Sequence, residues 1–154
     1  MKLERDELAL RATQFVENLI RGMGLELEVS AESNEEGIRL ELRGEDRGLL
    51  LANNARLLYA LNHLVNQIYY RQSKDGCNFL LDCNNYRDDR AVELRLMAIK
   101  AAEKVRISGM KVTMQPMPSS ERRIIHLTLA DTEDVTTQSE GGGRYRRVLI
   151  VPAK

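Results

Sequence analysis

The chain has 154 residues, of which 43% are apolar and 30% are charged, a balance typical of a folded protein rather than a disordered one. Its 23 basic and 23 acidic residues leave a net charge of zero, so the molecule as a whole offers no field that would attract a polyanion. No stretch approaches the roughly 18 apolar residues of a membrane span, and the charged start MKLERDELAL lacks the apolar run of a signal peptide. We therefore expect a cytoplasmic protein that does not insert into a membrane.

The first part of the chain predicts two helices and three strands. Apolar residues recur at helical spacing in two segments, and two further segments alternate strictly between apolar and charged residues, as in a hairpin with one buried face. A short helical turn precedes the second helix, which either Asn53 or Asn54 can cap. In chain order, the helices and strands are expected at residues 6–22, 25–29, 38–42, 57–68 and 77–83.

A polar segment, NNYRDDR, separates these elements from a second series. The chain after this segment predicts a long helix, a short strand and a second helix that is capped by Ser119 and has Glu121 in its first turn. Two strands joined by the flexible loop EGGGR follow. The long helix and the strands are expected at residues 87–106, 111–115, 134–139 and 145–151. The chain is thus expected to form two small α+β domains, residues 1–86 and 87–154.

The only cysteines, Cys77 and Cys83, are six residues apart in a predicted strand. At about 3.3 Å per residue they lie too far apart to form a disulfide with each other. They share one face of the strand with Phe79 and Leu81, so we expect small buried hydrophobic residues. The sequence offers no further ligands for a metal site, and we expect no metal and no cofactor.

Arg122 and His126 are four residues apart, which places their side chains on the same face of a helix. An arginine fork and a histidine donor could together hold one phosphate group. The alternative is a structural pair that bonds to the backbone and holds the small domain together, and spacing does not decide between the two.

Charge is distributed unevenly along the chain. Up to residue 105 there are 15 basic and 18 acidic residues, whereas from residue 106 there are 8 and 5. The excess arginines of the second part suit a sugar-phosphate backbone, although a charged strand edge is an equally good explanation. They are Arg122, Arg123, Arg144, Arg146 and Arg147.

Other candidate sites are weaker. Glycines 141–143 lack the Lys-Ser/Thr of a phosphate-binding P-loop and are better explained as a hairpin tip, while His63 is expected on a helix surface. No Cys, His and Asp arrangement has the spacing of a catalytic nucleophile or a metal site, so we do not expect an enzyme.

The segment SSERRIIHLTLA followed by TTQSEGGGRYRRVLI resembles the R-three-H domain, a module named for an arginine and a histidine with three residues between them. Its flank PMPSSERRIIH resembles the version found in the bacterial Jag family, where this domain follows a type II KH domain whose element order matches residues 6–85. The resemblance implies a protein that binds RNA or single-stranded DNA mainly through the R-three-H domain. The residues that it implies for this binding are Arg122, Arg123, His126, Ser139, Arg144, Arg146 and Arg147.

The sequence departs from the family pattern in two places. Jag proteins often carry an additional N-terminal domain, whereas this chain begins almost at the KH helix. KH domains also clamp nucleic acid with a GxxG loop, and the matching loop here is Ala52, Asn53, Asn54 and Ala55, with alanine at both glycine positions and no basic residue. The KH half is therefore expected to bind nucleic acid weakly. A second function stays open, in which this half pairs with another KH protein or with itself.

Overall fold

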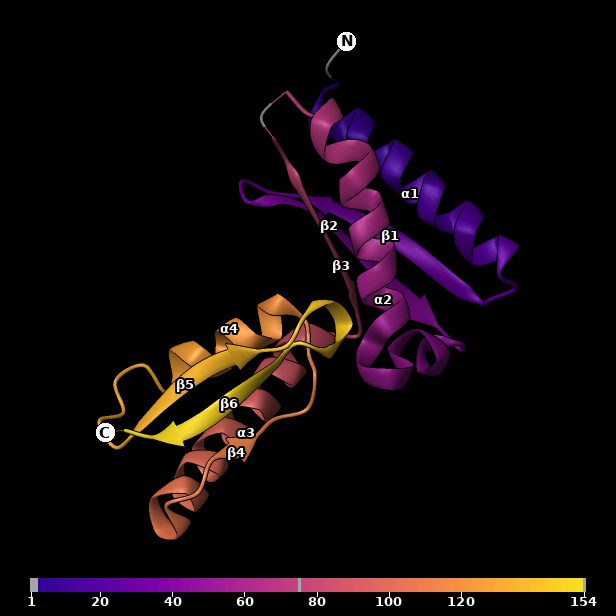
Figure 1. Ribbon diagram of the computed structural model, residues 1–154. Coiled ribbons are helices and arrows are strands. Elements are labelled where there is room, and N and C mark those ends of the chain that lie inside the picture. Colours follow the sequence, from indigo (N-terminus) through magenta and orange to yellow (C-terminus); the bar gives the residue numbers. More distant parts are fainter. Residues whose placement is uncertain (1–2, 75, 154) are drawn as a thin grey trace. The chain divides into compact units, whose positions relative to one another are not determined.

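The computed structural model describes residues 3–74 and 76–153. They fold into two compact units, one ending at Tyr86 and the other beginning at Arg87 (Figure 1). Each unit has its own cluster of buried apolar side chains. No helix among the described residues is both long and apolar enough to cross a membrane.

The first unit packs two helices against a mixed three-stranded sheet in the order β1-β2-β3. β1 and β2 form an antiparallel hairpin, and β2 pairs with β3 in parallel. A parallel pair needs a long crossover, which α2 provides. The elements are α1 (Arg5–Gly22), β1 (Leu27–Ser33), β2 (Gly37–Gly44), α2 (Arg47–Tyr69), the short 3-10 helix η1 (Tyr70–Gln72) and β3 (Asn78–Cys83).

The core of this unit follows the expected patterns. α1 buries one residue per turn and β2 buries alternate residues. Phe79, Leu81 and Cys83 of β3 are buried, as is Cys77, which precedes the strand. Both cysteines are free and buried, which confirms the prediction of small hydrophobic residues. The expected order of helices and strands and the α+β class are confirmed, although the first strand, expected at residues 25–29, is observed at Leu27–Ser33.

α2 is interrupted near its start. Ala52 is extended, and Asn53, Asn54 and Ala55 have φ angles of 53°, 57° and 55°, so a left-handed loop separates two helical segments. A residue that caps a helix N-terminus normally has an extended backbone. The predicted cap at Asn53 or Asn54 is therefore wrong, because both residues are left-handed.

The second unit places two helices on one face of an antiparallel sheet with the order β4-β6-β5. Its sheet turns alternate residues toward the helices, and the core contains Leu94, Ile125, Val135, Val148 and Ile150. The elements are α3 (Tyr86–Ser108), β4 (Val112–Thr113), α4 (Ser119–Thr128), β5 (Val135–Glu140), the 3-10 helix η2 (Gly143–Tyr145) and β6 (Arg147–Pro152).

The start of α4 differs from the prediction. Ser119 is the first helical residue rather than the cap, and Pro118 occupies the capping position without a side-chain hydrogen bond. Proline has a fixed φ and no N–H, so it suits the start of a helix. Ser119 has helical geometry and does not cap the helix.

Candidate functional site

The helix α4 lies beside β5 (Figure 1). Hydrogen bonds to Ser139 show that Arg122 and His126 face that strand. The helix is held in place by Ile125 and Leu129, which are buried in the core of the unit. Four residues make slightly more than one helical turn, so the arginine and the histidine face the same strand. Their polar atoms meet two hydroxyl groups of β5.

These contacts form one hydrogen-bonded network. The Nη1 atom of Arg122 donates to Ser139 Oγ at 3.1 Å. The Nε2 atom of His126 lies 3.0 Å from the same Oγ, and its Nδ1 atom lies 2.7 Å from Thr137 Oγ1. Ser139 and Thr137 are two apart on a strand and therefore point to the same side of the sheet. The Ser139 hydroxyl joins the arginine to the histidine.

Burial lowers the pKa of His126, and the nearby charge of Arg122 lowers it further. His126 is therefore neutral at neutral pH, with one ring nitrogen donating and the other accepting. Both ring nitrogens already have hydroxyl partners, so His126 holds the side chains of Thr137 and Ser139 in position.

The close approach of Ser139 and His126 is not an activated nucleophile. A catalytic base normally has its second nitrogen oriented by a carboxylate, whereas Thr137 supplies a hydroxyl here. The lowered pKa of His126 weakens it as a base, and the Ser139 oxygen also accepts a bond from Arg122. The geometry fits positioning of the guanidinium better than nucleophilic catalysis.

Arg122 keeps donors that the protein does not use. Its Nε atom is buried without a hydrogen-bond partner among the described residues, and one of its five N–H groups is used on Ser139. The buried Nε is out of reach of a ligand, but the planar guanidinium can offer its remaining Nη donors to the oxygen atoms of a phosphate group.

A buried ion pair joins α4 to α3. Glu121 is 2% exposed, and its carboxylate accepts from Arg90 Nη2 at 3.3 Å. Arg90 also donates to Glu93 at 2.7 Å. The sequence indicated only that Glu121 lies in the first turn of a helix. In the structure its carboxylate also links α4, next to Arg122, to the long helix α3.

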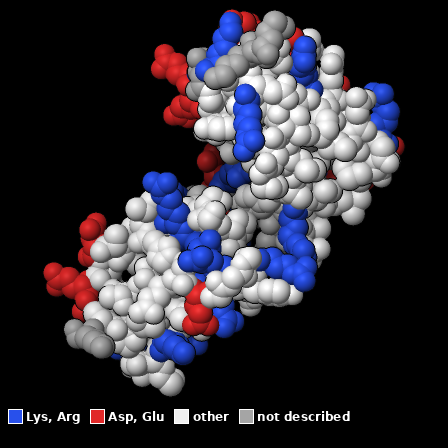
Figure 2. Space-filling model, turned by 45° about the horizontal axis from the view of Figure 1, so that its top comes forward, with Lys and Arg blue, Asp and Glu red and all other residues white. Residues whose placement is uncertain are grey.

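The other predicted arginines differ in exposure and in ion pairing. Arg123, Arg144 and Arg146 are exposed, whereas Arg147 forms an ion pair with Glu140 at 3.1 Å that offsets part of its charge. Figure 2 shows Lys and Arg side chains gathered in some places and Asp and Glu side chains in others on the face that it presents. The positive charge is a local feature of a neutral molecule.

Tyr145 is a candidate that we did not predict. It ends η2 in the loop between β5 and β6 and is 64% exposed, and the guanidinium of Arg144 lies 5.0 Å from the centre of its ring. The signal in the sequence was an aromatic residue between arginines in RYRR, since nucleic-acid sites interleave aromatic and basic side chains.

The predicted KH loop lies at the interruption of α2. Ala52, Asn53 and Asn54 are exposed there, while Ala55 is fully buried in its left-handed conformation. The loop thus separates two helical segments, as a GxxG loop does, but it presents no basic side chain. Phosphate attraction at this loop is correspondingly small.

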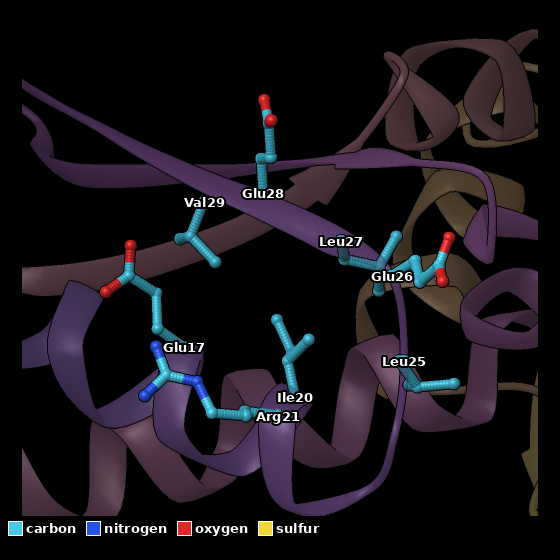
Figure 3. Close-up of a pocket in the computed structure, with 8 residues that line it drawn as sticks. All are labelled: Glu17, Ile20, Arg21, Leu25, Glu26, Leu27, Glu28 and Val29. Carbon is cyan, nitrogen blue, oxygen red and sulfur yellow. The ribbon is translucent and has the colours of Figure 1, made fainter.

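A hollow of about 480 Å³ lies between the end of α1 and β1 (Figure 3). Figure 3 shows Ile20 and Val29 pointing toward one another across it, while Glu28 points away. Its lining includes three glutamates and one arginine, so it does not suit a polyanion. Among the residues that the structure describes, no group of three His, Cys, Asp or Glu side chains could hold a metal.

Known proteins resemble the chain over nearly its whole length. The R-three-H domain family matches residues 92–152. The RNA-binding protein KhpB of Clostridium symbiosum is 32% identical over 148 residues, which cover 95% of this chain and 67% of that protein.

Two further proteins with the same name extend this similarity. The one from Bacillus subtilis is 29% identical over 150 residues, covering 96% of this chain and 72% of that protein. The one from Lactiplantibacillus plantarum is 30% identical over 150 residues, covering 97% of this chain but only 47% of the relative. The chain therefore spans between about half and three quarters of these relatives, and it belongs to the KhpB (Jag) family.

Proposed function

We propose that the chain binds single-stranded nucleic acid, RNA in the first place, through the surface formed by α4 and the loop between β5 and β6. The relatives are named RNA-binding proteins, and the R-three-H match covers this surface. The observation that carries the proposal is the guanidinium of Arg122, which Ser139 holds through Nη1 while Nη2 has no acceptor among the described residues.

In this proposal Arg122 binds a phosphate group, and His126 and Ser139 position its guanidinium. The exposed residues Arg123, Arg144 and Arg146 add charge, and Arg147 contributes less because Glu140 is paired with it. Phosphate contacts of this kind provide affinity without base preference and weaken as salt concentration rises.

The first unit contributes little to this binding. We propose that it is a type II KH-like domain whose loop, residues 52–55, lacks both the glycines and the basic side chains of a phosphate clamp. A methyl group at each end of the loop hinders the close approach that glycine allows. DNA is an alternative ligand for the second unit, since phosphate contacts do not distinguish the two nucleic acids.

The test compares two replacements of Arg122 in the full chain. Binding of a fluorescent single-stranded RNA is measured with Arg122→Ala and Arg122→Lys, and Arg21→Ala in the first unit serves as the control. Lysine keeps the charge but cannot reproduce the fork, so we expect both Arg122 variants to bind more weakly and alanine to bind most weakly. Equal affinity of all four proteins, with the fold intact, would remove Arg122 from the site.

A second candidate function is docking of a protein at the first unit. β1 forms one edge of its sheet, and the hollow beside it contains Ile20, Leu25, Leu27 and Val29. The glutamates around this edge disfavour pairing with an identical strand, because like charges would face each other. A partner with a basic and apolar segment fits this edge better than a second copy.

Light scattering over a range of concentrations tests self-association. Association that Val29→Glu abolishes and Arg122→Ala leaves unchanged would support a role of the β1 edge. A constant mass of one chain would contradict pairing of the chain with itself.

We further propose that the protein acts by binding rather than by catalysis and that it works in the cytoplasm. The names of the relatives support the first statement. The free buried thiols Cys77 and Cys83 support the second, because free thiols are typical of reducing compartments.

A further inference from the structure

We propose that Tyr145 is a stacking site for one nucleobase of a single strand, and that it gives the phosphate site its preference for unpaired nucleic acid. This inference rests on the proposed function, since it assigns the part of the ligand that the arginines do not bind. The observation that supports it is the position of the exposed Tyr145 ring, which lies between arginines at the end of the sheet where Ser139 binds Arg122.

The ring of Tyr145 can accept a base on the face that Arg144 does not cover. It is 64% exposed, and its hydroxyl has no hydrogen-bond partner among the described residues. A ligand can therefore cover this ring without breaking a hydrogen bond of the tyrosine hydroxyl. Arg144 lies over the ring at 5.0 Å, where its charge can also attract a phosphate.

The backbone beneath the ring is fixed, although the ring itself is exposed. The N–H of Tyr145 donates to the Gly142 oxygen at 3.1 Å, and the N–H of Arg146 donates to the Gly143 oxygen at 3.3 Å. The Arg146 oxygen accepts from Met117 N–H at 3.1 Å. A ring on a fixed turn loses less conformational freedom on binding than one on a mobile loop.

Gly141 makes this turn possible. Its φ of 88° is one that side chains rarely adopt, and an added Cβ would approach the Tyr145 oxygen to 3.0 Å. The glycine run therefore has a structural role, since it lets the chain fold back so that Tyr145 can project from the turn.

The stacking site is close to the phosphate site along the chain. In the β5 and β6 ladder Glu140, the neighbour of Ser139, pairs with Arg147, and Tyr145 lies two residues before Arg147. Two residues of strand span about 7 Å. A strand whose phosphate contacts Arg122 can therefore place a neighbouring base on Tyr145.

A stacked base explains single-strand preference in physical terms. Every base has a π face, so stacking tolerates any sequence, but in a duplex these faces are covered by neighbouring base pairs. Phosphate contacts alone do not make this distinction. The arginines therefore provide affinity and salt dependence, and the tyrosine provides the preference for unpaired bases.

The test measures binding of two probes to the full chain: an oligouridine strand and an abasic strand with the same number of phosphates. The variants are Tyr145→Leu and Tyr145→Phe, with Tyr70→Leu as a matched control because Tyr70 is an exposed tyrosine of the first unit. Phenylalanine retains the ring, whereas leucine retains apolar character without a π face.

We expect Tyr145→Leu to weaken binding of oligouridine about 5- to 150-fold, the range for loss of one stacked base, and to leave binding of the abasic strand unchanged. Tyr145→Phe and Tyr70→Leu should bind both probes as the unchanged chain does. The protein has no tryptophan, so Tyr145→Trp adds a single fluorophore that oligouridine should quench and the abasic strand should not.

Equal binding of oligouridine by Tyr145→Leu and the unchanged chain would overturn the stacking site, as would an equal loss on both probes. In both results the unchanged chain still binds, so the proposed function stands without the inference. If the unchanged chain binds neither probe, the proposed function fails and the inference fails with it.

Discussion

The Oγ atom of Ser139 lies 3.0 Å from His126 Nε2 and 3.1 Å from Arg122 Nη1, so one hydroxyl on β5 links both residues of the motif on α4. In the sequence the arginine and the histidine are related by a helical turn. In the structure they are related through a third residue on another element. This relationship makes Ser139 the residue on which the geometry of the site depends.

Replacing Ser139 should therefore affect binding more than replacing its neighbour. In Ser139→Ala, Arg122 loses its hydrogen bond, worth about 1 kcal/mol, and we expect RNA affinity to fall about fivefold. Thr137→Val is the control, because Thr137 contacts His126 and has no bond to Arg122. A titration of labelled RNA that gives the same affinity for both variants would show that Ser139 does not position Arg122.

His126 should make the stability of the second unit depend on pH. Its pKa in the folded protein is below the ordinary value of 6.5, because burial and Arg122 disfavour its charged form. Between the two pKa values the unfolded chain binds more protons, so the free energy of unfolding falls as pH falls below about 6.5 and levels off below the folded pKa.

Denaturant titrations between about pH 7.5 and about pH 4.5 test this dependence. We expect His126→Gln to remove the loss that begins near the ordinary pKa of 6.5. His63→Gln should retain it, since His126 is still present. Identical pH profiles for His126→Gln and the unchanged protein would contradict the prediction.

Glu121 should be the most important single carboxylate for the stability of the second unit. Among the described residues, Glu121→Ala leaves the largely buried Arg90 with the exposed Glu93 as its one acidic partner. Breaking a buried pair in this way costs about 3 kcal/mol. Glu93→Ala should cost less than about 1 kcal/mol, because Glu93 is exposed. Equal effects in thermal unfolding would mean that the buried pair adds no more than a surface contact.

Ala55 has a left-handed backbone that glycine adopts without cost. Because its φ is 55°, we predict that Ala55→Gly stabilises the protein by up to about 1 kcal/mol. This figure is what remains of the relieved backbone strain once the loss of the buried methyl group is subtracted. Ala60→Gly, at an exposed position of the same helix, should instead destabilise by about 1 kcal/mol. A destabilisation of Ala55→Gly as large as that of Ala60→Gly would contradict the argument from backbone strain.

Much of the fold could be predicted because its patterns are local. The apolar stripe of α1 and the alternation in β2 depend on periodicity, which residues close in sequence define. The two capping predictions, at Asn53 or Asn54 and at Ser119, failed for a different reason. Each depended on backbone angles that the residue type permits but does not determine.

The site could be predicted only in part. The helical spacing of Arg122 and His126 placed both on one face, but their partners Thr137 and Ser139 come from a strand whose register depends on pairing with β6. The ion pair of Arg90 with Glu121 spans 31 residues, and no local pattern indicates it. The exposure of Tyr145 likewise depends on the turn built on Gly141.

The most direct test of the account is the salt dependence of single-stranded RNA binding by two triple variants of the full chain. One replaces Arg123, Arg144 and Arg146 of the second unit with alanine, and the other replaces Arg21, Arg56 and Arg71 of the first unit. Each lost phosphate contact lowers the slope of log affinity against log salt by about 0.7 for a single strand. We predict a decrease of about 2 in the first variant and an unchanged slope in the second, whereas a decrease confined to the second variant would place the binding surface on the first unit.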